Sequence, residues 1–163
     1  MSITQAVIVC GGFGKRLGNI TLKTPKPLLK VNNLTVLEHI IKNLGRFGIK
    51  KTLLLCHYKY PLFKKKFHNK IFFGIKTLCI KESKPLGSSG ALYNTRKKLD
   101  NNFLFCNGDT FFDINLSDLI YQYIKSKQIA FIALKKITKD GSYHTFKLTK
   151  EKLIREDLYK KSH

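Results

Sequence analysis

The fold of this chain is constrained most by one sequence feature. This feature is an apolar run of strand length that stops at a cluster of glycines. The run covers residues 6–10 and reads A-V-I-V-C. Three glycines follow within four positions, namely Gly11, Gly12 and Gly14. A strand that ends at glycines is followed by a tight turn whose backbone N–H groups stay uncovered. Such a turn can hold an anion, and three cations lie close by in the sequence: Lys15, Arg16 and Lys26.

Two well-known phosphate loops do not fit this spacing. A Walker A loop needs Ser or Thr after its Gly-Lys pair, and here Arg16 follows Gly14-Lys15. A dinucleotide fingerprint needs a glycine at position 17, which is Leu17, and an acid about 20 residues later for the ribose. A plain glycine turn with solvated basic residues stays open as the simpler alternative.

Size and composition favour one globular domain over residues 1–163. The chain is 43% hydrophobic and 25% charged, and its apolar runs are far shorter than a membrane span. We expect no membrane partner. The chain passes from Met1 into a strand pattern without the features of a secretory signal, which predicts a cytoplasmic location. The four cysteines lack the spacing of a zinc site, and we expect them to be small core residues.

The charge balance is strongly basic. Lys and Arg number 31 against 10 acidic residues, a formal net charge of +21. Because the excess is spread over many lysines, we expect no specific nucleic-acid partner, although a polyanion-binding basic domain stays open as an alternative function.

Strand and helix patterns alternate along the chain. Strands are expected at residues 6–10, 52–56, 75–80, 103–106 and 129–134, with a weak hairpin from 145–148 and 153–154. Helices are expected to start at a capping box of Thr35 and Glu38, near residue 62, at Ser88 or Ser89, and at Ser117. This alternation predicts an α/β fold with a mostly parallel sheet and helices on both faces.

Three informative loops directly follow expected strands. They cover residues 11–16, 82–90 and 107–113. Since ligands bind beyond the carboxyl ends of parallel strands, these loops should meet in one cleft. Asp109 in the third loop is a hard oxygen ligand suited to Mg²⁺ beside a polyphosphate. The pattern indicates phosphoryl or nucleotidyl transfer, which depends on positioning and charge neutralisation.

Four motifs together resemble one enzyme family. They are G-G-F-G-K-R-L at 11–17, P-K-P at 25–27, E-S-K-P-L-G-S-S-G-A-L at 82–92 and N-G-D-T-F-F-D at 107–113. In this order they are similar to the sugar-1-phosphate nucleotidyltransferases, and most of all to the guanylyltransferases of the heptose and mannose type. The resemblance implies a Rossmann-like three-layer α/β/α sandwich of the nucleotide-diphospho-sugar transferase type.

The resemblance also implies roles for single residues. Arg16, Lys26 and Asp109 would be catalytic, with Asp109 the ligand of Mg²⁺. The nucleotide-binding residues would be Gly11, Gly12, Gly14, Arg16, Glu82, Pro85, Gly87 and Gly108. Glu82 falls at the base-facing position, where a carboxylate could accept hydrogen bonds from N1–H and N2–H of guanine.

The implied reaction joins a nucleoside triphosphate, with GTP favoured, to a sugar 1-phosphate for cell-surface polysaccharide synthesis. The partners are these two substrates, and a homo-oligomer is left open. The family pattern covers residues 4–135, whereas 136–163 diverge and the family's C-terminal part is missing. A truncated nucleotide-binding remnant with weak or no activity is therefore the alternative function.

Overall fold

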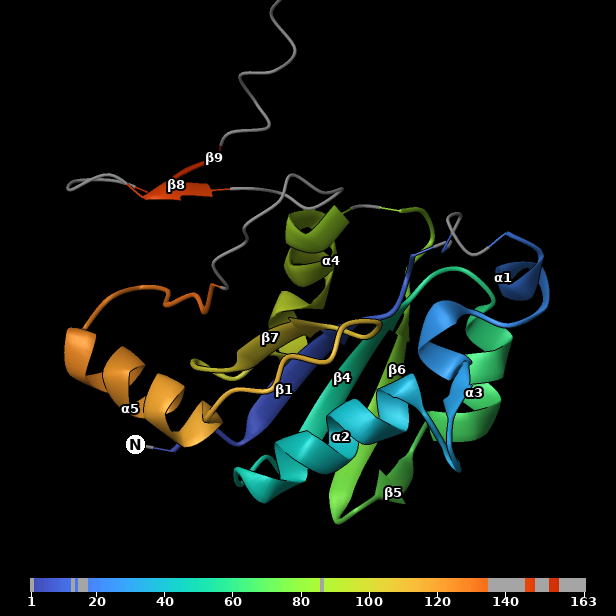
Figure 1. Ribbon diagram of the computed structural model, residues 1–163, viewed down its shortest axis with the longest axis horizontal. Helices are drawn as coiled ribbons and strands as arrows, with labels where there is room; N and C mark the ends of the chain where they lie inside the picture. Colours follow the sequence, from blue (N-terminus) through green and yellow to red (C-terminus); the bar gives the residue numbers. More distant parts are fainter. Residues whose placement is uncertain are drawn as a thin grey trace, which may run out of the picture. The chain divides into compact units, whose positions relative to one another are not determined.

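The computed structural model describes residues 2–12, 14, 18–85 and 87–134, and the backbone of 146–148 and 153–155. The chain divides into two compact units, residues 1–129 and 130–163. The first unit contains a five-stranded sheet in the order β5-β6-β4-β1-β7 (Figure 1). Its strands are β1 (Gln5–Val9), β4 (Lys51–Cys56), β5 (Lys70–Phe72), β6 (Ile75–Lys81) and β7 (Leu104–Asn107). All neighbours pair in parallel except β5 with β6.

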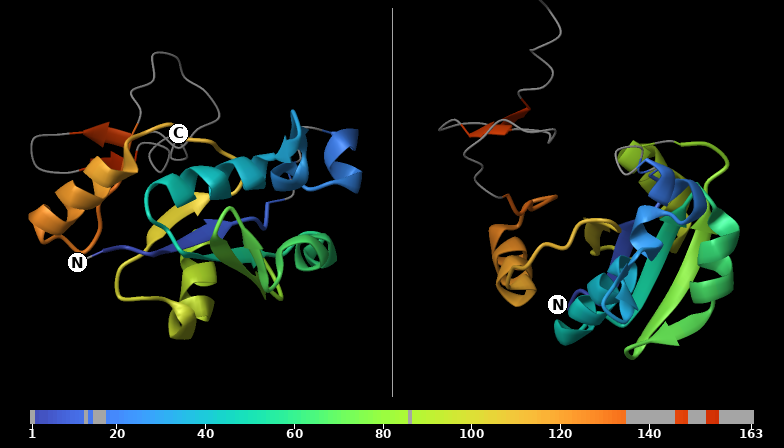
Figure 2. Two further views of the ribbon diagram at one scale, coloured as in Figure 1. Left: turned by 90° about the horizontal axis from the view of Figure 1, so that it is seen from below. Right: turned by 45° about the vertical axis from the view of Figure 1, so that its right-hand side comes forward.

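Helices cover both faces of this sheet (Figure 2). Side chains alternate along each strand, so Ala6 and Ile8 face one side and Val7 the other. The first side packs against α2 (Val36–Arg46), α3 (Tyr60–Phe67) and α5 (Leu116–Ser126). The second side packs against α4 (Gly87–Thr95), which a short turn of helix, η3 (Arg96–Lys98), extends. The predicted α/β sandwich with a mostly parallel sheet is confirmed.

Most of the expected boundaries agree with the structure. The capping box is present, because Glu38 N–H donates to Thr35 Oγ1 at 3.2 Å and Thr35 N–H donates to Glu38 Oε2 at 2.7 Å. Gly48, with a φ of 83°, follows the end of α2 as expected. In the second unit, β8 (Phe146–Leu148) and β9 (Leu153–Arg155) form the expected antiparallel hairpin.

Two helix starts differ from the sequence prediction. Asn115 rather than Ser117 caps α5, since its side-chain oxygen accepts hydrogen bonds from the N–H groups of Ser117 and Asp118. Helix α4 begins at Gly87, so Ser88 and Ser89 lie inside its first turn instead of capping it. In both places the helix starts one or two residues before the expected cap.

The expected strand at 129–134 is wrong. These residues have no regular structure, and Ile129 is fully exposed. An apolar run becomes a strand only when a neighbouring strand takes its backbone hydrogen bonds, and within the described residues this run has no such neighbour. The sequence does not contain that information.

Several short elements were not expected. The antiparallel strand β5 is joined to β6 by Phe73 and Gly74, which both have positive φ. Such a turn suits a tight hairpin. The others are α1 (Asn19–Lys23), η2 (Lys26–Leu28), β2 (Lys30–Val31) and β3 (Leu34–Thr35). Elements of two to five residues are too short to show a hydrophobic period.

Glu38 joins α2 to α3. Its Oε2 accepts hydrogen bonds from Thr35 N–H at 2.7 Å and from Lys66 Nζ at 2.9 Å. Burial raises the pKa of Glu38, but the hydrogen bonds from Lys66 and Thr35 outweigh it, and the net pKa lies below its ordinary value. The ionised form is therefore favoured by folding.

Replacing Glu38 by Gln should lower the free energy of unfolding by about 1–2 kcal/mol at neutral pH, because the cap and the ion pair are both weakened. Since the folded pKa is depressed, this contribution is present above the unfolded pKa and is lost as the pH falls through the folded pKa. Urea unfolding at pH 7 and at acidic pH measures the difference.

A second pair of variants tests the ion pair. Lys66→Met removes the partner of Glu38, and Lys65→Met is its matched control. Lys65 is an exposed neighbour whose ammonium has no ion pair within the described residues, so only the first change should destabilise the fold. Equal effects of the two lysine variants would contradict the assigned role of the ion pair.

Candidate functional site

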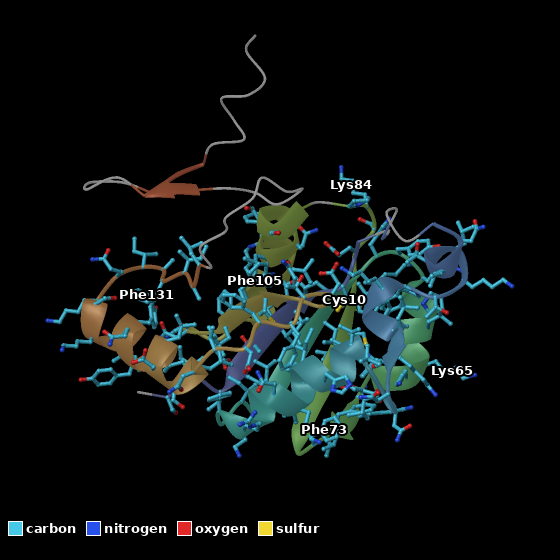
Figure 3. The ribbon with its side chains drawn as sticks, in the orientation of Figure 1. Cys10, Lys65, Phe73, Lys84, Phe105 and Phe131 are labelled. Atoms are coloured by element: carbon cyan, nitrogen blue, oxygen red, sulfur yellow. The ribbon has the colours of Figure 1, made fainter. Side chains whose placement is uncertain are left out.

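The ends of three strands bring the three informative loops together. The parallel hydrogen-bond ladder continues past each strand: Cys10 N–H donates to Leu55 O at 2.8 Å, and Glu82 N–H donates to Cys56 O at 2.9 Å. Gly108 N–H donates to Val9 O at 2.8 Å. The points where the three strands pass into these loops are therefore held in register at the carboxyl edge of the sheet. Figure 3 shows Lys84 at this edge, whereas Phe73 marks the opposite end of β6.

The glycines of the first loop make close contacts. A Cβ at Gly11 would lie 2.9 Å from Glu82 Oε2, and a Cβ at Gly14 would lie 2.9 Å from Thr21 Cγ2. Gly14 also has a φ of 63°, a backbone angle that residues with a side chain rarely adopt. Gly108 is packed as tightly, because its Cβ would lie 2.7 Å from Cys10 Sγ. A larger residue at any of these positions would displace a neighbour.

Lys26 and Asp109 face each other across the site. Lys26 Nζ lies 3.2 Å from Asp109 Oδ2, although the two residues are 83 positions apart in the chain. Asp109 Oδ1 also accepts a hydrogen bond from Thr110 Oγ1 at 3.1 Å. The Lys26 and Asp109 side chains are 39% and 41% exposed, so their ion pair contributes little to stability. Both groups remain accessible to a charged ligand.

Glu82 is a buried carboxyl group beside the glycine loop. The residue is 8% exposed, and Oε2 faces Gly11. Burial raises the pKa of Glu82, and the nearby His57 offsets only part of this rise. When ionised, this group can only accept hydrogen bonds, so it suits a ligand edge that presents donors.

The structure thus joins most of the predicted site residues through contacts. Those connected are Gly11, Gly14, Lys26, Glu82, Gly108 and Asp109. Gly12 is exposed, and a Cβ there would meet no described residue within 4 Å, so no contact in the described part of the chain requires glycine at this position. Pro85 and Gly87 lie in the loop after β6 and at the start of α4, both exposed. Arg16 lies outside the described residues.

Sequence reasoning missed His57 and Tyr58, which follow β4 at the same edge of the sheet. His57 Nδ1 lies 3.0 Å from Glu82 O, and Tyr58 donates to carbonyl groups of α1. The sequence signal that could have identified these two residues was their position at the end of an expected strand. A fourth apolar strand ends directly before a polar and aromatic pair, just as the other three strands end at informative loops.

No group of three or more metal-ligating side chains occurs within the part of the chain that the structure describes. A Mg²⁺ ion does not require one, since it is commonly held by one or two carboxylates together with substrate phosphates and water. Asp109, partly exposed beside Lys26, fits that kind of site. Among the described helices, none has the length and apolar character needed to cross a membrane.

Comparison with known proteins gives consistent matches. The profile of the nucleotidyl transferase family matches residues 5–156. A D-glycero-alpha-D-manno-heptose 1-phosphate guanylyltransferase from Campylobacter jejuni is 38% identical over 160 residues, which cover 96% of this chain and 70% of the relative. A probable mannose-1-phosphate guanylyltransferase from Oryza sativa is 38% identical over 130 residues, covering 78% of this chain and 34% of the relative.

A solved structure is similar as well. The crystal structure of HddC from Yersinia pseudotuberculosis complexed with GMP-PN has a TM-score of 0.67 and 26% sequence identity. The match covers 75% of this chain and 55% of that chain. This chain is therefore similar to part of a longer protein in each of these comparisons. The profile match and the 38% identity over nearly the whole chain confirm the resemblance seen in the motifs, and the chain belongs to the nucleotidyl transferase family.

Proposed function

We propose that this protein is a sugar-1-phosphate guanylyltransferase. It would join GTP and a sugar 1-phosphate, of the heptose or mannose type, to give a GDP-sugar and pyrophosphate. The observation that carries the proposal is the 3.2 Å approach of Lys26 to Asp109 beside two glycine-bearing loops. The names of the relatives from Campylobacter jejuni and Oryza sativa support the choice of base and sugar class.

The triphosphate would bind along the first loop. Close packing keeps Gly11 and Gly14 free of side chains, so backbone N–H groups can approach phosphate oxygens. Gly108 and Gly12 would border the same ligand. Arg16 is assigned to the pyrophosphate end from the sequence alone, as a cation that neutralises the leaving group.

The base would lie against the loop after β6. Glu82 would accept hydrogen bonds from N1–H and N2–H of guanine, and Pro85 and Gly87 would line the rest of the pocket. A buried carboxylate favours a base that presents two adjacent donors, because a base with one donor beside an acceptor would leave one carboxylate oxygen unpaired.

The reaction would be an in-line displacement at the α-phosphorus. An oxygen of the sugar phosphate forms the new P–O bond, the bond to the bridging oxygen of the β-phosphate breaks, and pyrophosphate leaves. The attacking group is already anionic, so no general base is needed. Lys26 would hold the α-phosphate or the sugar phosphate and offset its charge. Asp109 would hold Mg²⁺, which when bound supplies further neutralisation of phosphate charge.

The remaining expectations are part of the same proposal. We propose one nucleotidyltransferase domain, a cytoplasmic location and no specific nucleic-acid partner, and a homo-oligomer stays a prediction. The truncated remnant with weak or no activity stays the alternative function, because the chain covers 70% of the length of the heptose-type relative. No described contact favours a polyanion-binding role.

The enzymatic proposal predicts pyrophosphate release from GTP, Mg²⁺ and a sugar 1-phosphate from a panel that includes heptose and mannose forms. Lys26→Met and Asp109→Asn should each lower kcat/KM by about 100-fold or more, since each removes a charge facing the reacting phosphates. Lys65→Met on the outer surface of α3 is the matched control and should leave the rate unchanged. Wild-type protein that binds GTP but turns over no sugar phosphate would instead support the remnant.

The base assignment predicts a pH-dependent preference. Glu82→Gln should reduce the preference for GTP over UTP by about 10-fold or more, because an amide no longer offers two acceptors. In the wild type, the preference should fall on acidification. The fall should begin at a pH above the usual range of carboxyl pKa values, because burial raises the pKa of Glu82. The protonated carboxyl group cannot accept both hydrogen bonds from guanine. Binding titrations across pH 5–8 measure this, and a preference in Glu82→Gln equal to that of wild type would contradict the assignment.

A further inference from the structure

The turn after β4 lies between the two loops assigned to the nucleotide. In the sheet, β4 is the strand between β1, which leads into the glycine loop, and β6, which leads into Glu82. The turn consists of residues 57–59, which we call the β4 turn. Lys59 has a φ of 50°, and Tyr60 N–H donates to His57 O at 3.2 Å, so the chain reverses here before entering α3.

His57 contacts the base side of this arrangement. Its Nδ1 lies 3.0 Å from the carbonyl oxygen of Glu82, and because a carbonyl oxygen only accepts, Nδ1 must donate. Its Cβ would lie 3.4 Å from a Cβ at Gly11, and Glu82 Oε2 would lie 2.9 Å from that same Cβ. The imidazole ring therefore fixes the backbone of Glu82 at the point where the carboxylate meets the glycine loop.

Tyr58 contacts the triphosphate side through α1. Its hydroxyl lies 3.1 Å from Thr21 O and 3.1 Å from Leu22 O, so its proton can be donated to either. Thr21 in turn is 2% exposed, and its Oγ1 lies 3.1 Å from the carbonyl oxygens of Gly14 and Gly18. The chain of contacts runs from β4 through Tyr58 and Thr21 to the glycine loop.

Lys59 adds a second attachment of α1 to the same turn. Its Nζ donates to Lys23 O at 3.2 Å. Helix α1 has five residues, which is too short to be stable without such contacts. The position of α1, and with it the position of Thr21 against Gly14, therefore depends on the β4 turn.

We propose that His57 and Tyr58 are positioning residues for the nucleotide, His57 acting on the base-reading carboxylate of Glu82 and Tyr58 on the triphosphate loop. This inference rests on the proposed function. The two residues are adjacent in sequence but act on different parts of the ligand, so their effects separate. Loss of the His57 contact weakens the preference for one base over the others. Loss of the Tyr58 hydroxyl changes the affinity for every nucleoside triphosphate by the same factor, because all of them share the triphosphate.

The experiment measures kcat and KM for GTP, UTP and ATP in the full chain with the variants His57→Leu, His57→Asn and Tyr58→Phe. His57→Leu should reduce the ratio of kcat/KM for the preferred nucleotide over the others by about 10-fold. His57→Asn should restore most of that ratio, since its amide N–H can donate to Glu82 O. Tyr58→Phe should raise KM for all three nucleotides by about 3- to 10-fold with the ratio unchanged. Tyr121→Phe on the exposed side of α5 is the matched control and should change neither.

The possible outcomes are distinguishable. A role in folding alone would lower Tm without moving the ratio of nucleotides or the common KM, and that result would overturn the inference. A variant that folds too poorly for kinetics is replaced by His57→Asn and Tyr58→Phe, the two conservative changes, which carry the test by direct binding titration. Wild-type protein without nucleotide binding would overturn the proposed function itself. Wild-type selectivity that survives His57→Leu would overturn only the positioning role.

Discussion

The backbone ladder of the parallel sheet is the interaction on which the site depends. It extends past the regular strands, so that Cys10, Glu82 and Gly108 still donate to carbonyl groups of neighbouring strands. Each of these residues lies where a strand passes into a loop. Because the ladder fixes the register at the start of all three loops, their side chains and backbone N–H groups meet at one edge of the sheet.

Close backbone approach then decides which residues the loops can carry. Gly11, Gly14 and Gly108 each lie where a Cβ would come within 3 Å of another group. Gly12 has open space around it, so its contribution to the motif is not explained by packing. Position also decides which of the many positive charges belongs to the site. The chain has a net charge of +21, yet the ammonium group of Lys26 is distinguished by its place opposite Asp109 and not by its sign.

Residue patterns at short spacing predicted the helix cap and the core strands correctly, because these elements depend on neighbouring residues in the sequence. The capping box of Thr35 and Glu38 and the strands that became β1, β4, β6 and β7 follow from residue types at short spacing. The same reasoning assigned a strand to residues 129–134, because periodicity reports burial tendency and cannot report whether a pairing partner exists. It also passed over β5, whose three residues are held by pairing with β6.

The sequence by itself determined the family, the alternation of strands and helices, and the chemical types gathered in the three loops, because glycine, proline, lysine and aspartate carry that information locally. The tertiary structure decided which of those groups touch: Lys26 with Asp109, Glu82 with the Gly11 position, and Tyr58 with α1. These contacts join residues up to 83 positions apart. They exist because parallel strands from distant parts of the chain end at the same edge, and only the assembled sheet establishes that order.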